Sequence, residues 1–297
     1  MTRVVIVGGG IMGGGIAIAL VRAGHVVTVV EPDAATATKL AARLTERPWA
    51  SSHHAADVRP DLETVSTAEF VIEAAPEDLD LKIRLWSKLG EIAPGGAILA
   101  TNTSSLDVNL LAAGVPEPQR VVATHWFNPA YEVECVEVAP GLVTSAEVLE
   151  KTLSLLRGAG KRPVVVPNVA GFVANRVQFA AIREALLCVA EGIPPSDVDE
   201  VVRTSFAPRL AALGPLANAD LGGLDTYLAI FEVLRTAHGE RFSPPALLSQ
   251  LVGDGRLGVK NGAGVFEYTP SSAAALAELR DARLSRIISA AAIAEER

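Results

Sequence analysis

A histidine and a glutamate are the first residues of this 297-residue sequence that could do acid–base chemistry. His125 follows the apolar segment 121–124, and Glu137 lies twelve residues further on, in the segment 132–138. If that segment is a strand, Glu137 shares a face with apolar residues, and a carboxylate on such a face needs a partner. A Glu bound to one ring nitrogen fixes the tautomer and leaves the other nitrogen available as a base. The alternative is a β-bulge that turns Glu137 to solvent.

Two polar side chains, Ser104 and Asn175, are candidates for contacts with a substrate. Ser104 belongs to the polar run 101–105, which follows an apolar strand at 97–100, and open parallel sheets bind ligands where their strands end. Its hydroxyl could equally stabilise a turn. Asn175 lies at helical spacing from apolar residues, so its amide needs hydrogen-bond partners. Those partners could be backbone groups or a substrate oxygen, and spacing alone leaves both open.

A glycine-rich turn near the N-terminus predicts a dinucleotide site. It follows the apolar segment 4–7 and has the spacing G-x-G-x-x-G. The first glycine permits a tight turn, the second lets the backbone approach a pyrophosphate, and the third lets the next helix pack on the strand. The N–H groups that open that helix would bind the phosphates. The residues of this turn that we expect to contact the cofactor are Gly8, Gly10, Ile11, Met12 and Gly13.

The next apolar strand ends in an acidic residue, Glu31, which favours NAD as the cofactor. Glu31 lies 18 residues past Gly13, close to where dinucleotide folds place the carboxylate that binds the adenosine ribose. A carboxylate there repels the 2′-phosphate of NADP, and residues 32–34 contain no Arg to bind one. Segment 4–21 is uncharged and as long as a membrane span, but six of its 18 residues are glycine, which forms helices poorly.

The elements that must position these residues alternate between strands and helices. We expect strands at 4–7, 26–30, 70–75, 97–100, 121–124, 132–138 and 163–166, and helices at 11–22, 34–47, 79–92 and 141–158. This order predicts an α/β fold with a Rossmann-type doubly wound sheet. The stretch 48–60 is expected to be irregular. Its histidines, His53 and His54, are expected to be structural, because no third metal ligand is near, and no metal site is predicted.

Beyond residue 167 the pattern is almost wholly helical, which predicts an all-α C-terminal domain. We therefore expect two domains, an NAD-binding domain at 1–167 and a helical domain at 168–297. A long helix is expected over 172–190, and Ser196 is expected to cap the next helix. The Ala-rich run 271–276 is expected to be a linker into a later helix.

The composition indicates which partners to expect. The chain is 49% apolar and 20% charged, which favours an apolar surface that closes against another subunit. The net charge of −8 argues against binding to nucleic acid. Cys135 and Cys188 are the only cysteines, so the sequence predicts neither a disulfide framework nor a zinc site, and it favours a cytoplasmic location.

Several motifs in one order resemble the NAD-dependent L-3-hydroxyacyl-CoA dehydrogenase family. This family includes 3-hydroxybutyryl-CoA dehydrogenases and the λ-crystallin or L-gulonate 3-dehydrogenase branch. The resemblance runs from about Val4 to Tyr268. Besides the glycine turn it rests on Ala100–Leu106 (ATNTSSL), His125–Pro129 (HWFNP), Val136–Val138 (VEV), Gly171–Arg176 (GFVANR) and Gly258–Gly262 (GVKNG).

The resemblance implies a role for each candidate. His125 would be the catalytic base and Glu137 its orienting partner. Ser104 would donate to the substrate hydroxyl, and Asn175 would position the substrate. His125 would take the 3-hydroxyl proton of a small-molecule substrate while the hydrogen on C3 leaves as hydride to the nicotinamide. The implied cofactor contacts beyond the glycine turn are Glu31, Glu77, Lys82, Ser104, Asn128 and Lys260. A homodimer formed through the helical domain and a role in fatty acid metabolism are implied as well.

Two departures from the family pattern leave the acyl carrier open. Only 41 residues separate Glu31 from Glu73, so the Lys-rich hairpin with which CoA-using members bind the CoA nucleotide is expected to be truncated. Tyr131 stands where CoA enzymes more often have Pro, and it resembles the branch that oxidises free 3-hydroxy acids. The substrate could therefore be attached to CoA, attached to a carrier protein, or free. For a free acid, candidate carboxylate ligands are Arg176, Arg203 and Arg209.

Two further classes of protein are weighed against this interpretation. A cofactor-binding structural protein, as crystallin relatives suggest, would not need the histidine, the glutamate, the serine and the asparagine together. Hydroxyisobutyrate and phosphogluconate dehydrogenases share the two-domain plan. They use a catalytic Lys on the first long helix of the second domain, and residues 172–190 contain no Lys.

Overall fold

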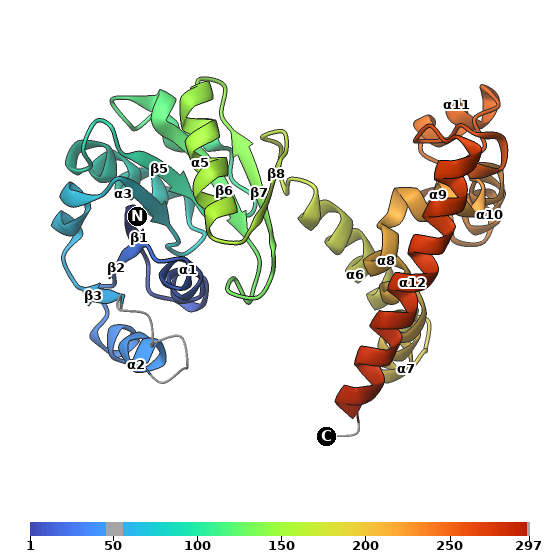
Figure 1. The fold of residues 1–297 in the computed structure, drawn as a ribbon, viewed down its shortest axis with the longest axis horizontal. Helices are drawn as coiled ribbons and strands as arrows, with labels where there is room; N and C mark the ends of the chain where they lie inside the picture. Colours follow the sequence, from blue (N-terminus) through green and yellow to red (C-terminus); the bar gives the residue numbers. More distant parts are fainter. Residues whose placement is uncertain (46–55, 296–297) are drawn as a thin grey trace. The chain divides into compact units, whose positions relative to one another are not determined.

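The computed structural model describes residues 1–45 and 56–295, with side chains described as far as residue 291. His53 and His54 lie outside the described residues, as does most of the stretch expected to be irregular. The chain forms two compact units, Met1–Ala181 and Ile182–Arg297 (Figure 1).

The first unit is built on one sheet with the strand order β3-β2-β1-β4-β5-β6-β7-β8 (Figure 1). Strands β1 to β6 are parallel, β7 runs antiparallel to β6, and β8 is parallel to β7. The strands are β1 (Arg3–Val7), β2 (Val26–Val30), β3 (Asp57–Arg59), β4 (Phe70–Glu73), β5 (Ile98–Thr101), β6 (Val121–Trp126), β7 (Cys135–Pro140) and β8 (Arg162–Val165). The predicted Rossmann-type doubly wound sheet is confirmed.

Helices cover both faces of this sheet, which explains why its strands are almost continuously apolar. Ile16 and Leu20 of α1 belong to the core on one face, together with residues of α2 and α5. Trp86 and Leu89 of α3 belong to the core on the other face, together with residues of α4. The helices of this unit are α1 (Ile11–Arg22), α2 (Ala34–Thr45), α3 (Leu79–Ile92), α4 (Val108–Ala112) and α5 (Ala146–Gly158), with short 3-10 turns η2 (Leu62–Thr67) and η3 (Pro118–Arg120).

Several predicted bounds differ from the structure: the strand expected at 70–75 ends at Glu73, and the helix expected at 141–158 begins only at Ala146, after its cap Ser145. One strand was missed, and two further differences matter for the site. β6 continues to Trp126, so His125 lies within the strand rather than after it. β7 begins at Cys135 rather than at residue 132, because a turn closed by N–H groups of Glu132 and Val133 on the carbonyl of Pro129 precedes it. β3 was not predicted, since three partly exposed residues pairing at the edge of a sheet leave no apolar pattern.

The second unit is helical, as predicted, and α6 begins in the first unit and continues into the second. The helices are α6 (Ala174–Ala190), α7 (Pro195–Val201), α8 (Ala207–Leu213), α9 (Pro215–Gly222), α10 (Leu224–His238), α11 (Ala246–Gly253) and α12 (Pro270–Glu295), with short turns η4 (Val202–Phe206), η5 (Glu240–Phe242) and η6 (Val259–Asn261). A domain boundary near residue 168 stays a prediction. Across residues 1–45 and 56–295, none of the helices has both the length and the apolar character needed to cross a membrane.

Two local predictions in this unit are wrong. Pro194 precedes α7 and no side chain caps it, so Ser196 lies inside the first turn instead of at the cap. The Ala-rich run 271–276 belongs to α12 rather than to a linker, because Ala has the highest intrinsic helix propensity.

Candidate active site

The antiparallel pairing of β6 with β7 brings the predicted acid–base pair together. His125 and Glu137 are direct cross-strand partners in the register, so their side chains leave the same face of the sheet. Nδ1 of His125 lies 2.9 Å from Oε2 of Glu137, and the two side chains are 7% and 4% exposed. The predicted pairing is therefore present, and the bulge that would have turned Glu137 to solvent is absent from this described strand pair.

Backbone hydrogen bonds fix the position of Glu137, which in turn orients the ring of His125. Its other oxygen, Oε1, accepts hydrogen bonds from the backbone N–H groups of Val173 at 3.0 Å and Ala174 at 2.9 Å. With the carboxylate as acceptor, Nδ1 of His125 carries the proton and Nε2 of the neutral ring carries a lone pair. No described residue hydrogen-bonds Nε2. The ring is flanked by Phe127 and Phe172, whose centroids lie 4.6 Å and 5.7 Å away.

Ser104 lies on a loop after β5 that is bound by a second carboxylate. Oε1 of Glu77 accepts from the Ser104 N–H at 3.0 Å and from the Thr103 hydroxyl at 2.5 Å, and the Ser104 hydroxyl lies 3.5 Å away. Burial alone would raise the pKa of Glu77, but the Thr103 hydrogen bond, the charge of Lys82 and the Ser104 N–H together lower it. Glu77 is therefore ionised and accepts hydrogen bonds at neutral pH.

Asn175 meets the same loop. Its Nδ2 donates to the carbonyl of Ser104 at 3.1 Å, which is the backbone-binding alternative of the sequence prediction. No other hydrogen bond to its amide is found among the described residues, so Oδ1 and the second N–H stay available for a substrate oxygen. The structure thus joins Asn175 to Ser104, while their roles in catalysis stay predictions.

The glycine turn has the shape that a bound pyrophosphate requires. Gly8 has a φ of +111°, and a Cβ there would lie 2.6 Å from the carbonyl oxygen of Ala74. A Cβ on Gly13 would collide with the carbonyl oxygen of Gly8. At Gly10, by contrast, a Cβ would meet nothing within 4 Å, and the neighbouring Ile11 is 68% exposed at the start of α1. Open space beside unpaired helix N–H groups fits a dinucleotide phosphate.

Glu31 takes part in forming this turn. Its Oε2 accepts from the N–H of Gly9 at 2.8 Å, and its Oε1 accepts from the N–H of Asp33 at 2.9 Å. The carboxylate therefore fixes the glycine turn against the end of β2, a role that the spacing rule did not predict. The predicted contact of Glu31 with the ribose stays a prediction.

Three residues that are predicted to contact the cofactor have no described side-chain interaction with the glycine turn. Lys82 is 1% exposed and enclosed by carboxylates, so it could act on a cofactor only through a neighbour. Asn128 is exposed and makes no hydrogen bond among the described residues. Lys260 belongs to the second unit, where it pairs with Asp225. Direct cofactor contacts from these residues stay predictions.

Sequence reasoning missed one buried acid next to the site. Glu73, the last residue of β4, has no exposed surface and pairs with Lys82 at 2.6 Å. The signal was present in the sequence, because an acidic residue ends the apolar run 70–72 just as Glu31 ends the run 26–30.

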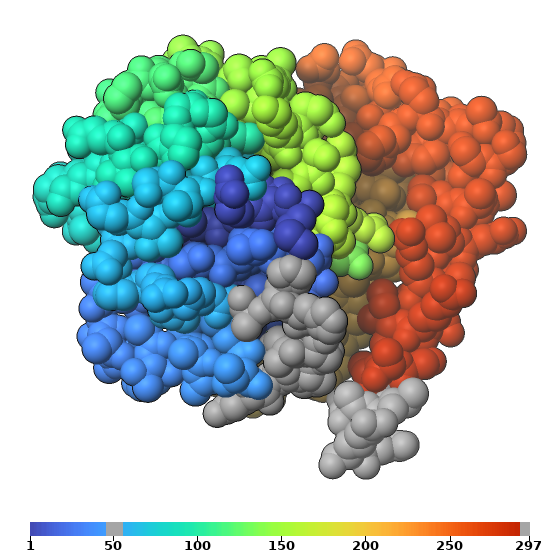
Figure 2. Space-filling view, turned by 60° about the vertical axis from the view of Figure 1, so that its left-hand side comes forward, coloured from blue at the N-terminus to red at the C-terminus, as the bar shows by residue number. Residues whose placement is uncertain are grey.

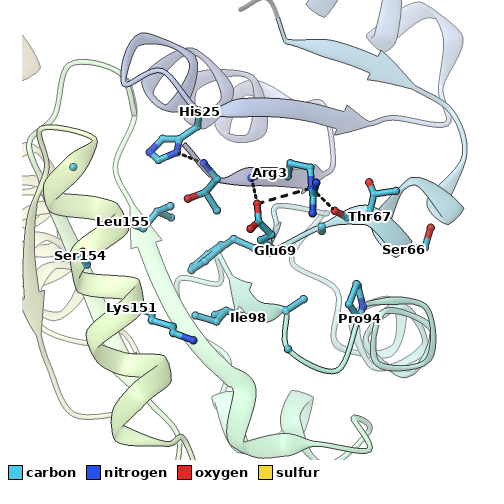
Figure 3. A pocket seen from close by; sticks show the side chains of 16 residues that line it. Arg3, His25, Ser66, Thr67, Glu69, Pro94, Ile98, Lys151, Ser154 and Leu155 are labelled. Atoms are coloured by element: carbon cyan, nitrogen blue, oxygen red, sulfur yellow. Dashed lines mark hydrogen bonds and ion pairs between the residues drawn. The ribbon is translucent and has the colours of Figure 1, made fainter.

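One cavity lies near the N-terminal ends of the parallel strands, at the opposite end of the sheet from these residues. Its volume is about 840 Å³, and its lining includes Arg3, Phe70 and Ile98, which are the first residues of β1, β4 and β5. Figure 3 shows Lys151 and Leu155 of α5 on another side of it. In Figure 2 the dark-blue start of the chain lies between light-blue and lime-green segments on this face.

Across the described parts of the chain, no group of His, Cys, Asp and Glu could hold a metal ion.

Comparisons with known proteins cover both units. The profile of the 3-hydroxyacyl-CoA dehydrogenase NAD-binding domain matches residues 3–169, and that of the C-terminal domain matches residues 171–268. A probable 3-hydroxybutyryl-CoA dehydrogenase of Bacillus subtilis is 38% identical over 281 residues, covering 90% of this chain and 97% of the relative. The 5-formyl-3-hydroxy-2-methylpyridine 4-carboxylate 5-dehydrogenase of Mesorhizobium japonicum is 33% identical over 224 residues, 75% of this chain and 72% of the relative.

A solved structure agrees with these sequence relatives. The crystal structure of a 3-hydroxyacyl-CoA dehydrogenase from Archaeoglobus fulgidus matches with a TM-score of 0.81 and 29% identity, covering 97% of this chain and 98% of that one. Together with the sheet and the glycine turn, this makes the protein an NAD-dependent oxidoreductase. The matched domains account for nearly the whole length, and the chain belongs to the 3-hydroxyacyl-CoA dehydrogenase family. The resemblance seen in the sequence is confirmed.

Proposed function

We propose that this protein oxidises an (S)-3-hydroxyacyl thioester to the 3-oxoacyl thioester with NAD, using His125 as the general base. The observation that carries the proposal is the buried contact of 2.9 Å between Nδ1 of His125 and Oε2 of Glu137. This contact leaves Nε2 with a lone pair, and a base of this kind raises the rate of proton transfer at neutral pH. Glu137 also stabilises the imidazolium that forms when Nε2 takes the proton.

The remaining polar groups orient the substrate in this proposal. The Ser104 hydroxyl lies on a loop that Glu77 holds, and it donates to the substrate hydroxyl. The amide of Asn175 binds a substrate oxygen with the groups that it does not use on Ser104. The nicotinamide of NAD, when bound, accepts the hydride from C3. The phosphates would be held by the glycine turn at Gly10 and the first N–H groups of α1.

The name of a relative supports a CoA thioester as the substrate. The Bacillus subtilis relative is a probable 3-hydroxybutyryl-CoA dehydrogenase, and this chain covers 97% of its length. A thioester on a carrier protein presents the same acyl group and is part of the proposal.

A free carboxylic acid is the second candidate substrate, and one comparison favours it. The Mesorhizobium japonicum relative is named for a pyridine carboxylate, which has no CoA. Tyr131, the residue that departs from the CoA-enzyme pattern, has the guanidinium groups of Arg22 and Arg43 at 5.4 Å and 5.8 Å from its ring centre. Of the arginines proposed as carboxylate ligands, Arg203 pairs with Glu200 at 2.6 Å.

One assay distinguishes these substrates and tests the base. NADH formation is followed with (S)-3-hydroxybutyryl-CoA, with the same acyl group on a carrier protein, and with free (S)-3-hydroxybutyrate and L-gulonate. We expect turnover of a thioester, and turnover of free acids alone would overturn the thioester assignment. His125→Ala should lower kcat about a hundredfold to ten-thousandfold. His238→Ala, which changes a histidine on α10, is the matched control. Equal rates for His125→Ala and wild type would remove His125 from the mechanism.

We also infer that the protein is a cytoplasmic homodimer that associates through its helical unit. Apolar side chains that are each more than half exposed support this, namely Leu186, Val201, Val233, Leu247 and Ile288. Both cysteines are unpaired thiols, which supports a reducing compartment. Light scattering at micromolar protein concentration should give twice the chain mass of 31.0 kDa. A clean monomer would contradict the dimer.

A further inference from the structure

Glu73 is a fully buried carboxylate that the proposed mechanism does not use. Its Oε1 accepts from the N–H of Ala75 at 2.7 Å and from Nζ of Lys82 at 2.6 Å. Its Oε2 accepts from the hydroxyl of Thr101 at 2.8 Å and from the indole N–H of Trp86 at 3.2 Å. All four partners donate to Glu73, so both of its oxygens are used as hydrogen-bond acceptors.

Lys82 joins this carboxylate to Glu77. Its Nζ lies 2.6 Å from Glu73 and 3.3 Å from Oε2 of Glu77. Burying two charges is costly, and apolar side chains of the same size often give an equally stable or more stable protein. Stability alone therefore gives no reason for a charged pair at this position. The contacts that Glu73 and Lys82 make with neighbouring segments offer another reason for the charged pair.

The pair holds the loop that carries Ser104 at two points. At the first, the Thr101 hydroxyl donates to Glu73 and accepts from the N–H of Thr103 at 3.1 Å. At the second, Oε1 of Glu77 binds the loop while its Oε2 faces Lys82. The loop donors to Oε1 are the Thr103 hydroxyl at 2.5 Å, the Ser104 N–H at 3.0 Å and the Ser105 hydroxyl at 3.2 Å.

The sheet register relates this group to the histidine. Glu73 pairs with Thr101, and Thr101 pairs with Ala123. His125 lies two residues beyond Ala123 on β6 and therefore leaves the same face of the sheet. The loop that is anchored to Glu73 thus starts on the strand next to the one that carries His125.

We propose that Glu73 and Lys82 are positioning residues, which act through Glu77 to hold Ser104 at a fixed place relative to His125. This proposal rests on the proposed function of the site. Lys82 keeps Glu77 ionised beside a second carboxylate, because two unneutralised carboxylates close together disfavour ionisation. A protonated Glu77 would lose an acceptor and release a loop donor. The expected signature is a loss in the chemical step without a loss in cofactor affinity.

The test is the double variant Glu73→Gln, Lys82→Met, which keeps both side-chain volumes and removes the two fully buried charges together. We expect kcat to fall at least about tenfold, the deuterium isotope effect on hydride transfer to rise, and the Kd for NADH to change less than about twofold. Hydrogen exchange of the backbone amides at 103–106 should be faster. The matched control is Glu147→Gln, Lys151→Met, which removes an exposed ion pair of 2.7 Å on α5 and should change none of these.

Other outcomes would overturn the proposal. Wild-type kcat with unchanged exchange would show that the pair only supports the fold. A large loss of NADH affinity with kcat preserved would make Lys82 a cofactor contact instead. If the double variant does not fold, Thr103→Val removes the shortest of the three loop hydrogen bonds to Glu77 without touching the buried charges, and wild-type kcat with wild-type exchange at 103–106 in that variant refutes the proposal. The exchange measurement needs no turnover, so it tests the loop even if wild type proves inactive on every hydroxyacyl substrate.

Discussion

Replacing Glu137 by Gln should abolish most of the activity while leaving the fold in place. The Gln carbonyl can still accept the N–H groups of Val173 and Ala174, which lie 3.0 Å and 2.9 Å from the present Oε1. Its NH₂ group then faces Nδ1 of His125, where Oε2 now lies 2.9 Å away. An NH₂ group donates, so Nδ1 must accept and the ring proton moves to Nε2. A protonated Nε2 cannot act as the base.

The magnitudes of the effects on activity and stability separate this variant from Glu137→Ala. Loss of a general base typically lowers kcat about a hundredfold to ten-thousandfold, and we expect Glu137→Gln to fall in that range. Its unfolding free energy should drop by only about 1 kcal/mol, the difference between a charge-assisted and a neutral hydrogen bond. Glu137→Ala leaves two N–H groups unpaired at about 1–3 kcal/mol each, which gives a loss of about 2–6 kcal/mol.

The assay is steady-state kinetics at saturating NAD combined with urea unfolding of the three proteins. Glu137→Gln should combine near wild-type stability with a low kcat, and Glu137→Ala should lose both. A Gln variant with wild-type kcat would refute the reasoning, because the tautomer would then have no bearing on the reaction. Equal stability of the Ala and Gln variants would refute the role assigned to the two backbone N–H groups.

Three further predictions follow from single residues. Gly13→Ala should abolish NADH binding in a fluorescence titration, because its Cβ would collide with the preceding turn, whereas Gly158→Ala, which meets nothing within 4 Å, should bind normally. Because the folded-state pKa of Glu77 is lowered, its stabilising contribution is present above its unfolded pKa and lost as pH falls through the folded pKa. Unfolding free energy between pH 3 and pH 6 should therefore depend less on pH in Glu77→Gln, and parallel curves would contradict this. Burial and the charge of Glu137 raise the pKa of Cys135, so iodoacetamide should label Cys135 more slowly than a free thiol at pH 7.5, as measured by mass spectrometry.

The sequence predicted the dinucleotide half of the fold well because its signals are local. Helix α1 and strand β2 have the predicted bounds, since an apolar strand, a glycine turn and an apolar helix follow one another without interruption. The strand β3 at the edge of the sheet was missed for the opposite reason. It is formed by pairing with a distant strand, and Asp57–Arg59 has no apolar pattern of its own.

The candidate site was predicted in part, and the missing part depends on register. Parity within one strand suggested that Glu137 needed a partner, but only the antiparallel pairing of β6 with β7 places it directly opposite His125. No pattern within a short stretch of sequence indicates that Glu77 binds the Ser104 loop, or that Glu73 binds Thr101 at the start of that loop. Those contacts join residues 27 and 28 positions apart, across neighbouring strands.

Two carboxylates use their oxygens in the same way at this site. Glu137 gives one oxygen to the histidine ring and the other to the backbone that starts α6. Glu77 gives one oxygen to the Ser104 loop and the other to Lys82. A carboxylate has two acceptor atoms on a rigid plane, so fixing one atom orients the other. His125 and the loop that carries Ser104 are therefore each held by an acid that is itself held elsewhere, which is the preorganisation that proton and hydride transfer require.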